Sequence, residues 1–345
     1  MNNTLLAILV VAASLTLATA ARQNARQDVS TYLTRAGLAS SDVSRLDTGA
    51  VVTHVTNGQS PNELFVVAAV KVRAPRQRVT DFYGQMIAFV DGSVTLAFGR
   101  FGSPPSIADV KDLAFDRRDV DDMKSCRPGR CDVRLGGAGL DKLRSAIDWS
   151  ATDYVERVNG FARKAAVDYV AAYQSRGDAA LFTYTDRAEA VSLKEQWLGI
   201  SGNSPLFHQY TPELKTYLEQ FPRGSLPGVR NVFYWSKENY GFKPVINIVH
   251  GVIYAPTAQS DRTIVVQKQL YASHYLDGSL AVATLLDTED SGRRATYLLY
   301  ANRLRGDMLK GGFGGLKRNA ALSQARKAAE QTLGTIKQSV EAAVR

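Results

Sequence analysis

The chain has four histidines, the side chains best suited to proton transfer near neutral pH, and they stand far apart in the sequence. They are His54, His208, His250 and His274. None belongs to a His-Glu-x-x-His or similar metal-binding spacing, and the sequence has no Gly-x-Ser-x-Gly nucleophile motif. A structural role is therefore the simpler interpretation of each. The alternative is that His250 or His274 acts as a general base in a cavity.

Two segments that we expect to be β-strands carry polar side chains among apolar ones. Alternation over residues 246–254 places His250 on one face and Asn247 on the other, and over residues 268–276 it separates His274 from Tyr271. A few polar groups on an apolar face are typical of a ligand pocket, whereas a sheet with one solvated face is the simpler alternative. We predict these four residues as ligand-orienting groups.

Aromatic residues gather in the strand expected at residues 230–240. Alternation places Phe233 and Trp235 on one face and Tyr234 on the other. Core packing is the default role, and the functional alternative is an aromatic wall in which Phe233 and Trp235 contact a flat apolar ligand. The nearby Lys237 and Lys243 would then favour an anionic head group.

A glycine-rich run around Phe313, at residues 311–315, precedes the last helical segment. It lacks the Gly-Lys-Ser/Thr ending of a phosphate-binding loop. The backbone freedom of glycine suits a hinge, so we expect Phe313 and its glycines to gate a ligand cavity beneath the final helix.

No metal ion and no cofactor is expected from the residue patterns. The acidic run at residues 116–122 is interrupted by Arg117 and Arg118 and does not match a calcium loop, so a solvated loop is the simpler interpretation.

The two cysteines, Cys126 and Cys131, flank a Pro-Gly turn signal. A turn would bring them together, and we predict a structural disulfide formed in an oxidising compartment. A redox pair and a metal site are the alternatives; the first usually has two intervening residues, and the second has no partner ligands nearby.

The elements that must position these residues fall into three stretches. A lead-in at residues 21–47 precedes strands at 50–55, 63–73 and 94–101, with a helix at 76–89. Short strands and turns are expected at 107–135, and helices over 139–222. Five strands with short links follow at 230–240, 243–254, 263–275, 279–287 and 295–302, and they predict an antiparallel meander.

A long amphipathic helix is expected at residues 316–344. Its apolar positions recur every three or four residues and define one helical face: Leu322, Ala325, Ala329, Leu333, Ile336, Val340 and Val344. Laid across a curved sheet, such a helix either seals a core or roofs a cavity.

This order of elements resembles the helix-grip fold of the START lipid-transfer and polyketide cyclase-like proteins. The resemblance rests on the strand at residues 66–75, which ends in Ala74-Pro75, on the helix after it, and on residues 297–305 with the final helix. It implies an α+β fold in which a curved antiparallel sheet grips the C-terminal helix, with an apolar ligand in a cavity between them. Residues 48–345 would form one domain, with the helical section at 139–222 as an insertion longer than usual members have.

The N-terminus predicts export. Residues 5–17 form an uncharged, mostly apolar run, and Ala18-Thr19-Ala20 offers a small-residue cleavage site, so residues 1–20 read as a signal peptide. An uncleaved anchor helix is the alternative, although the run is short for a membrane span. We expect a periplasmic or secreted protein.

The composition is that of a globular protein, with 45% hydrophobic and 22% charged residues and a formal net charge of +9. Basic residues are scattered among acidic ones, which favours transient contact with an anionic membrane surface over a nucleic-acid groove; simple solubility is the alternative.

These observations converge on an exported carrier of a lipid or another apolar small molecule, without a cofactor and without nucleic acid as a partner. A cyclase-like or hydrolase-like enzyme in the same cavity is one alternative. An envelope adaptor with a filled core is the other.

Overall fold

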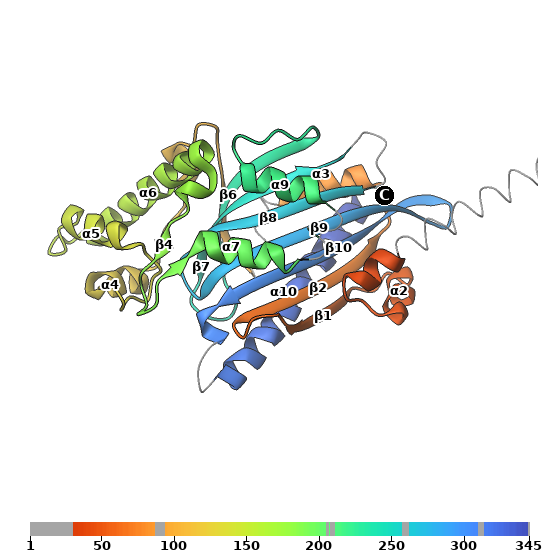
Figure 1. Ribbon diagram of the computed structural model, residues 1–345, viewed down its shortest axis with the longest axis horizontal. Coiled ribbons are helices and arrows are strands. Elements are labelled where there is room, and N and C mark those ends of the chain that lie inside the picture. Colours follow the sequence, from red (N-terminus) through yellow and green to blue (C-terminus); the bar gives the residue numbers. More distant parts are fainter. Residues whose placement is uncertain are drawn as a thin grey trace, which may run out of the picture.

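The computed structural model describes residues 30–86, 94–204, 207, 211–256, 262–309 and 314–343. Its centre is one eight-stranded sheet in the order β1-β2-β10-β9-β8-β7-β6-β3, in which neighbouring strands are antiparallel (Figure 1). The strands are β1 (Val52–Asn57), β2 (Glu63–Val72), β3 (Thr95–Phe101), β6 (Val229–Glu238), β7 (Val245–Tyr254), β8 (Arg262–Ala272), β9 (Leu276–Asp290) and β10 (Arg293–Gly306).

The early and late strands belong to the same sheet. β2 pairs with β10, and β3 pairs with β6, so the meander β6 to β10 lies between strands that precede the helical section. The predicted fold class is confirmed: the chain is an α+β protein with a curved antiparallel sheet and a long C-terminal helix.

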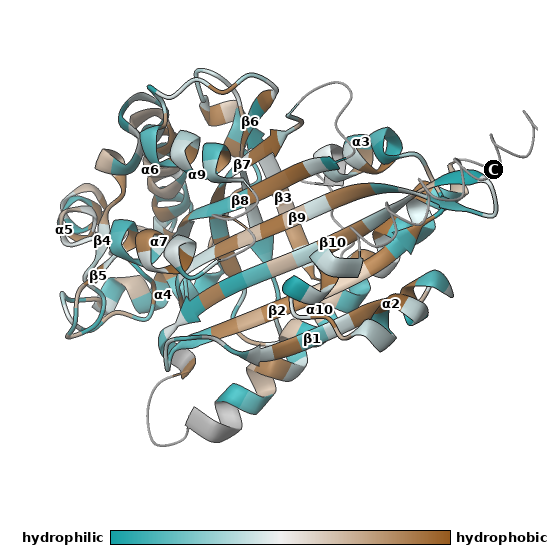
Figure 2. Cartoon of the chain, turned by 45° about the vertical axis from the view of Figure 1, so that its right-hand side comes forward, coloured by the Kyte–Doolittle hydropathy of each residue, from teal (hydrophilic) through white to brown (hydrophobic). Residues whose placement is uncertain are grey.

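One face of the sheet, the inner face, is covered by α10 (Gly314–Ala342) and α3 (Arg76–Met86), which cross it as Figure 2 shows. The apolar stripe predicted for the last helix lies against the sheet. Ala329, Leu333, Ile336 and Val340 are buried in one cluster with β2, β9 and β10 side chains. Burial of this stripe fixes the helix on the sheet.

The opposite, outer face carries the remaining helices. α2 (Ser40–Asp47) packs on β1, β2 and β10, while α6 (Tyr154–Arg176), α7 (Leu193–Gly202) and α9 (Pro212–Gln220) pack on β6 to β9. α4 (Arg117–Ser125) and α5 (Gly137–Ala146) pack against α6 at the end of the molecule seen on the left of Figure 1. The section predicted as a helical insertion therefore forms much of the outer layer.

Shorter elements connect the layers: β4 (Thr183–Tyr184) and β5 (Val191–Ser192), and the 3₁₀ turns η1 (Ile107–Val110), η2 (Gly177–Ala180) and η3 (Asp307–Leu309).

The region predicted as short strands and turns, 107–135, instead contains α4. Only Val120 and Met123 of this helix give it an apolar stripe, and the charged residues around them hide the helical period. The predicted disulfide is present: Cys126 and Cys131 are bonded, with their Cα atoms 4.5 Å apart. Gly129 adopts a positive φ of 77° in the turn between them, and both cysteines are buried in the outer-face core.

Within the described residues, no helix is both long enough and apolar enough to cross a membrane. The expected signal peptide, residues 1–20, lies outside the described part of the chain.

Candidate functional site

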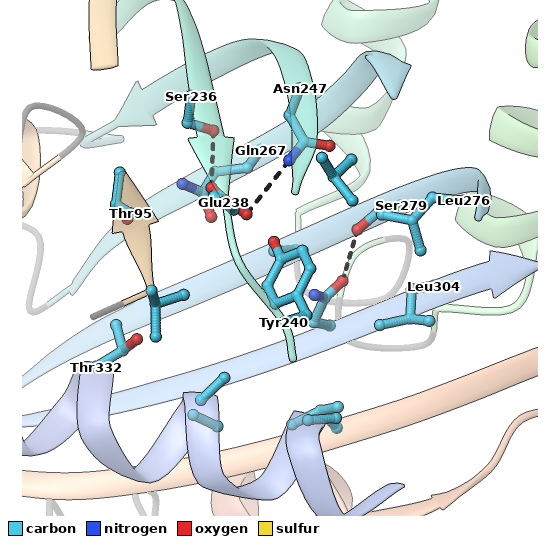
Figure 3. Close-up of a pocket in the computed structure, with 18 of the residues that line it drawn as sticks. Thr95, Ser236, Glu238, Tyr240, Asn247, Gln267, Leu276, Ser279, Leu304 and Thr332 are labelled. Carbon is cyan, nitrogen blue, oxygen red and sulfur yellow. Dashed lines mark hydrogen bonds between the residues drawn. The ribbon is translucent and has the colours of Figure 1, made fainter. Parts of the chain in front are cut away.

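A cavity of about 320 Å³ lies between the inner face of the sheet and α10 (Figure 3). This volume is at the lower end of the range that small-molecule sites occupy. Seven strands contribute side chains to it, from β3 at one edge of the sheet to β2 near the other.

The cavity exists because the N-terminal half of α10 presents small side chains to the sheet. Ala321, Ala325 and Ala328 follow one another at helical spacing, line the cavity and leave space that longer side chains would fill. Further along the helix, Ile336 and Val340 reach the sheet and close the core. The same helix therefore roofs a cavity at one end and seals a core at the other.

The walls of the cavity are mainly apolar. Leu64 and Val66 of β2, Phe98 of β3 and Leu333 of α10 line it, and Tyr240 and Phe242 join them from the loop between β6 and β7. Phe242 is 39% exposed and lies against Tyr275, with ring centroids 5.9 Å apart.

Four polar side chains form a continuous hydrogen-bond chain along β6, β7 and β8. Ser236 Oγ donates to Glu238 Oε1 at 2.7 Å, and Asn247 Nδ2 donates to Glu238 Oε2 at 3.3 Å (Figure 3). Gln269 Nε2 donates to Asn247 Oδ1 at 2.8 Å. The amide dipoles thus point toward the carboxyl group, whereas Gln269 Oε1 is buried and has no hydrogen-bond partner among the described residues.

Two further polar pairs line other parts of the cavity. Gln267 Nε2 donates to Tyr234 OH at 2.9 Å, and Ser279 Oγ donates to Asn302 Oδ1 at 2.9 Å. With the hydrogen-bond chain around Glu238, these pairs place a few polar groups within a mainly apolar enclosure, and such groups orient the ligand in small-molecule sites.

Glu238 dominates the electrostatics of the cavity. Burial raises the pKa of its carboxyl group, and the hydrogen bond from Ser236 opposes that rise only in part. The described lining residues include no Lys, Arg or His, and Glu238 has no ion-pair partner among the described residues. Burial also raises the pKa values of the Tyr234 and Tyr300 phenols beside it, with the Glu238 carboxyl as a further cause.

Of the residues predicted from sequence to contact a ligand, Asn247 lines this cavity. Five others lie on the outer face, within the core beneath the helical layer or beside α4: Phe233, Trp235, His250, Tyr271 and His274. Phe313 lies outside the described residues.

The outer-face residues have structural partners of their own. His250 Nε2 lies 2.8 Å from Asn231 Oδ1, its ring stacks on Phe233 with centroids 4.5 Å apart, and its Nδ1 faces Tyr173 of α6 at 3.2 Å. Burial, with a contribution from Lys268, holds the pKa of His250 well below its ordinary value. This histidine is therefore a neutral core residue.

His274 and Trp235 hold the α4 region against the sheet. His274 Nδ1 donates to the Asp132 carbonyl at 3.0 Å, and its Nε2 lies 3.3 Å from Asp119 Oδ2. Trp235 Nε1 donates to the Asp109 carbonyl at 2.9 Å. Because both predicted general bases lie across the sheet from the cavity, the geometry gives no basis for a histidine base there.

A β-bulge explains why Tyr271 is on the outer face. The register shifts between Ile248 and Val249, so that these residues pair with Tyr271 and Gln269, and Leu270 is left extra. Strict alternation would group Tyr271 with Gln269, but the extra residue turns it outward, where its hydroxyl donates to the Arg134 carbonyl at 3.1 Å.

Sequence reasoning missed Glu238, although a signal for it exists. Alternation along β6 that places Phe233 and Trp235 together also groups Tyr234 with Ser236 and Glu238 on the opposite face. That second face is the one that lines the cavity.

The lysines expected to attract an anionic head group are paired elsewhere. Lys237 Nζ lies 2.5 Å from Asp116 Oδ1, and Lys243 Nζ lies 2.5 Å from Asp132 Oδ2 and 2.7 Å from Asp122 Oδ2. The acidic run at residues 116–122 is therefore not the solvated loop predicted from sequence: most of it belongs to α4, and Asp116 binds the start of this helix to β6. In the described part of the chain, no group of His, Cys, Asp and Glu could hold a metal ion.

Comparison with known proteins adds no family to this description. No protein-family model matches the chain, and no curated protein is significantly similar to it in sequence.

Proposed function

We propose that this chain is a binding or transport protein for a lipid or another apolar small molecule, held between the inner face of the sheet and α10. The observation that carries the proposal is the cavity itself. An apolar enclosure with a few converging polar groups is the usual form of a small-molecule site, and burial of apolar ligand surface there contributes roughly 25 cal/mol per Å².

We also propose a relationship to the START-like proteins, because the curved sheet and the C-terminal helix have the layout that the sequence resemblance implies, with the ligand between them. We further propose that the protein acts outside the cytoplasm. The disulfide between Cys126 and Cys131 supports this location, as does the signal-like pattern of residues 1–20.

Direct isolation tests the proposal. The mature protein, purified from its native source, is analysed by native mass spectrometry and its bound molecules by organic extraction. We expect an apolar compound at close to one per chain. N-terminal sequencing of the same sample tests export, with a first residue of Ala21 expected; a chain that retains residues 1–20 would refute cleavage.

A fluorescent probe locates the binding site. Phenylnaphthylamine is neutral and becomes bright in apolar surroundings, so its uptake reports the cavity. Ala328→Phe places a ring in the cavity, whereas Ala320→Phe places the same ring on the exposed side of α10. We expect the first variant to lose probe binding about tenfold or more and the second to retain it.

Two results would overturn the proposal. An isolated protein that is empty and does not take up phenylnaphthylamine would indicate a filled core and favour the adaptor alternative. Equal probe binding by the two phenylalanine variants would place the ligand somewhere other than this cavity.

A further inference from the structure

We infer that the preferred ligand carries a protonated amine at its polar end, bound by the carboxylate of Glu238, with Gln269 Oε1 as a second acceptor in the cavity wall. This inference rests on the proposed function, because it names the chemical class of molecule that the same cavity takes.

The first step is the position of the only acid among the described lining residues. Glu238 lies at the end of β6 on the inner face, and both of its oxygens accept hydrogen bonds, one from Ser236 and one from Asn247. These donors are neutral, so they stabilise the carboxylate in part and leave its charge uncompensated. A ligand ammonium would supply the missing counter-charge.

The second step is the state of the neighbouring acceptors. Gln269 uses its amide nitrogen to donate to Asn247, and its buried Oε1 has no hydrogen-bond partner in the part of the chain that the structure describes. An unpaired buried acceptor is costly, and an N–H of a ligand would satisfy it. An ammonium offers three donors and no acceptor, which suits the two acceptors named here, the Glu238 carboxylate and Gln269 Oε1.

The third step concerns the anionic alternative. A fatty-acid carboxylate would bring a second negative charge next to Glu238, and the described lining offers it no Lys, Arg or His. The lysines nearest in sequence, Lys237 and Lys243, are paired with aspartates. The cavity therefore selects against anionic amphiphiles.

The experiment is displacement of phenylnaphthylamine from the full mature chain by three compounds with the same apolar chain: decylamine, decanol and decanoic acid. Near neutral pH the amine is a cation and the acid an anion, because their groups titrate close to those of Lys and Glu. We expect decylamine to bind at least about tenfold more tightly than decanoic acid, with decanol between them.

Glu238→Gln tests the assigned residue, and Glu330→Gln, an exposed carboxyl on α10, controls for the change in net charge. We expect Glu238→Gln to remove most of the preference of decylamine over decanol and Glu330→Gln to leave it unchanged. The measured quantity is the ratio of the decylamine and decanol affinities within one variant. A general loss of protein stability would weaken both affinities and would therefore not change this ratio.

The outcomes separate the two proposals. A chain that takes up no phenylnaphthylamine defeats the binding function itself. A chain that takes up the probe but releases it to decanoic acid as readily as to decylamine, or keeps its amine preference in Glu238→Gln, overturns the amine assignment and leaves the binding function standing.

Discussion

At the scale of single residues, the partly buried carboxyl of Glu238 is the feature from which most of the cavity chemistry follows. Its surroundings are neutral: Ser236 and Asn247 donate to it, and the phenols of Tyr83, Tyr234 and Tyr300 share the enclosure with raised pKa values. From α10, Gln324 and Thr332 face the same space and carry no charge. Burial without a cation is why the carboxyl pKa is raised.

This raised pKa predicts a particular pH dependence of stability. Between the pKa of an unfolded Glu, about 4.3, and the raised pKa in the fold, the folded chain binds more protons than the unfolded chain. The free energy of unfolding should therefore fall as pH rises through this window, and Glu238→Gln should remove that part of the fall.

Urea unfolding of both proteins from pH 4 to pH 8 measures the difference. We expect the wild type to lose stability relative to the variant as pH increases. A difference that stays constant over this range would show that Glu238 has the same pKa in both states.

Asn247 and Tyr271 mark the limit of what residue patterns predict. Alternation correctly separated the two faces of β7, because its residues keep one register with β6 throughout. Alternation failed for Tyr271 because one extra residue in β8 reverses which face the following side chains occupy. The sequence of β8 contains no glycine or proline that would indicate this bulge. Which face of the sheet carries the cavity depends on which helices pack on that face. That packing involves residues far apart in the sequence, so local alternation does not predict it.

At the scale of elements, α10 has two functions along its length. Its alanine-rich half roofs the cavity, and its half with larger side chains anchors it. The sequence predicted the anchoring stripe from spacing alone. It did not distinguish a sealed core from a roofed cavity, because that outcome depends on how far the opposing strands lie from each alanine.

The anchoring half can be tested with Ile336→Ala. Ile336 is 0% exposed and packs in the core between α10 and the sheet, so its truncation leaves a void there and the free energy of unfolding should fall by about 2–5 kcal/mol. Gln331→Ala, on the exposed side of the same helix, should change it by less than about 0.5 kcal/mol. Urea denaturation compares them; similar losses in both variants would mean that α10 is not held through this stripe.

The disulfide closes a short turn between α4 and the outer layer. Gly129 N donates to the Thr185 carbonyl at 2.7 Å, and Cys131 N donates to the Asp186 carbonyl at 3.0 Å, so the turn is also held by backbone hydrogen bonds. A loop this short constrains the unfolded chain modestly.

Replacing Cys126 and Cys131 with alanine should cost about 2 kcal/mol of unfolding free energy. Adding a reductant to the wild type should produce the same loss and should leave the double variant unchanged. If the reductant destabilises both proteins equally, the bond is not the source of the effect.

At the scale of the whole molecule, the sheet separates the inner face, which carries the cavity, from the outer face, which is packed against helices. The outer face contains buried charges, and the side chain of Lys268 is one that is fully buried. It pairs with Asp178 and lies over the Trp197 ring, 4.1 Å from its centroid. Desolvation outweighs the attraction of Asp178 and lowers the pKa of Lys268 from 10.5 to about 8.

This lowered pKa predicts the opposite pH dependence to that of Glu238. Between pH 8 and pH 10.5 the unfolded chain binds more protons at this lysine than the folded chain, so stability attributable to Lys268 rises with pH. The wild type should gain stability relative to Lys268→Met as pH rises from 8 to about 9.5. Lys327 is exposed and serves as the control, so the stability difference between the wild type and Lys327→Met should not change over the same range. Equal slopes in the two comparisons would contradict a lowered pKa.

The division into two faces also predicts where a bound ligand changes local stability. A molecule between the sheet and α10 contacts residues of both, so opening either element would require breaking those contacts. Saturation with phenylnaphthylamine should therefore slow backbone hydrogen exchange in α10 around residues 321–335 and in β6 to β8.

The helix α6 provides the internal control for this measurement, because it packs on the outer face of the same strands. Its exchange should be unchanged if the probe occupies the cavity. Protection concentrated in α6 would instead place the probe among the outer-face aromatic residues, and the face assigned to structure would become the face assigned to binding.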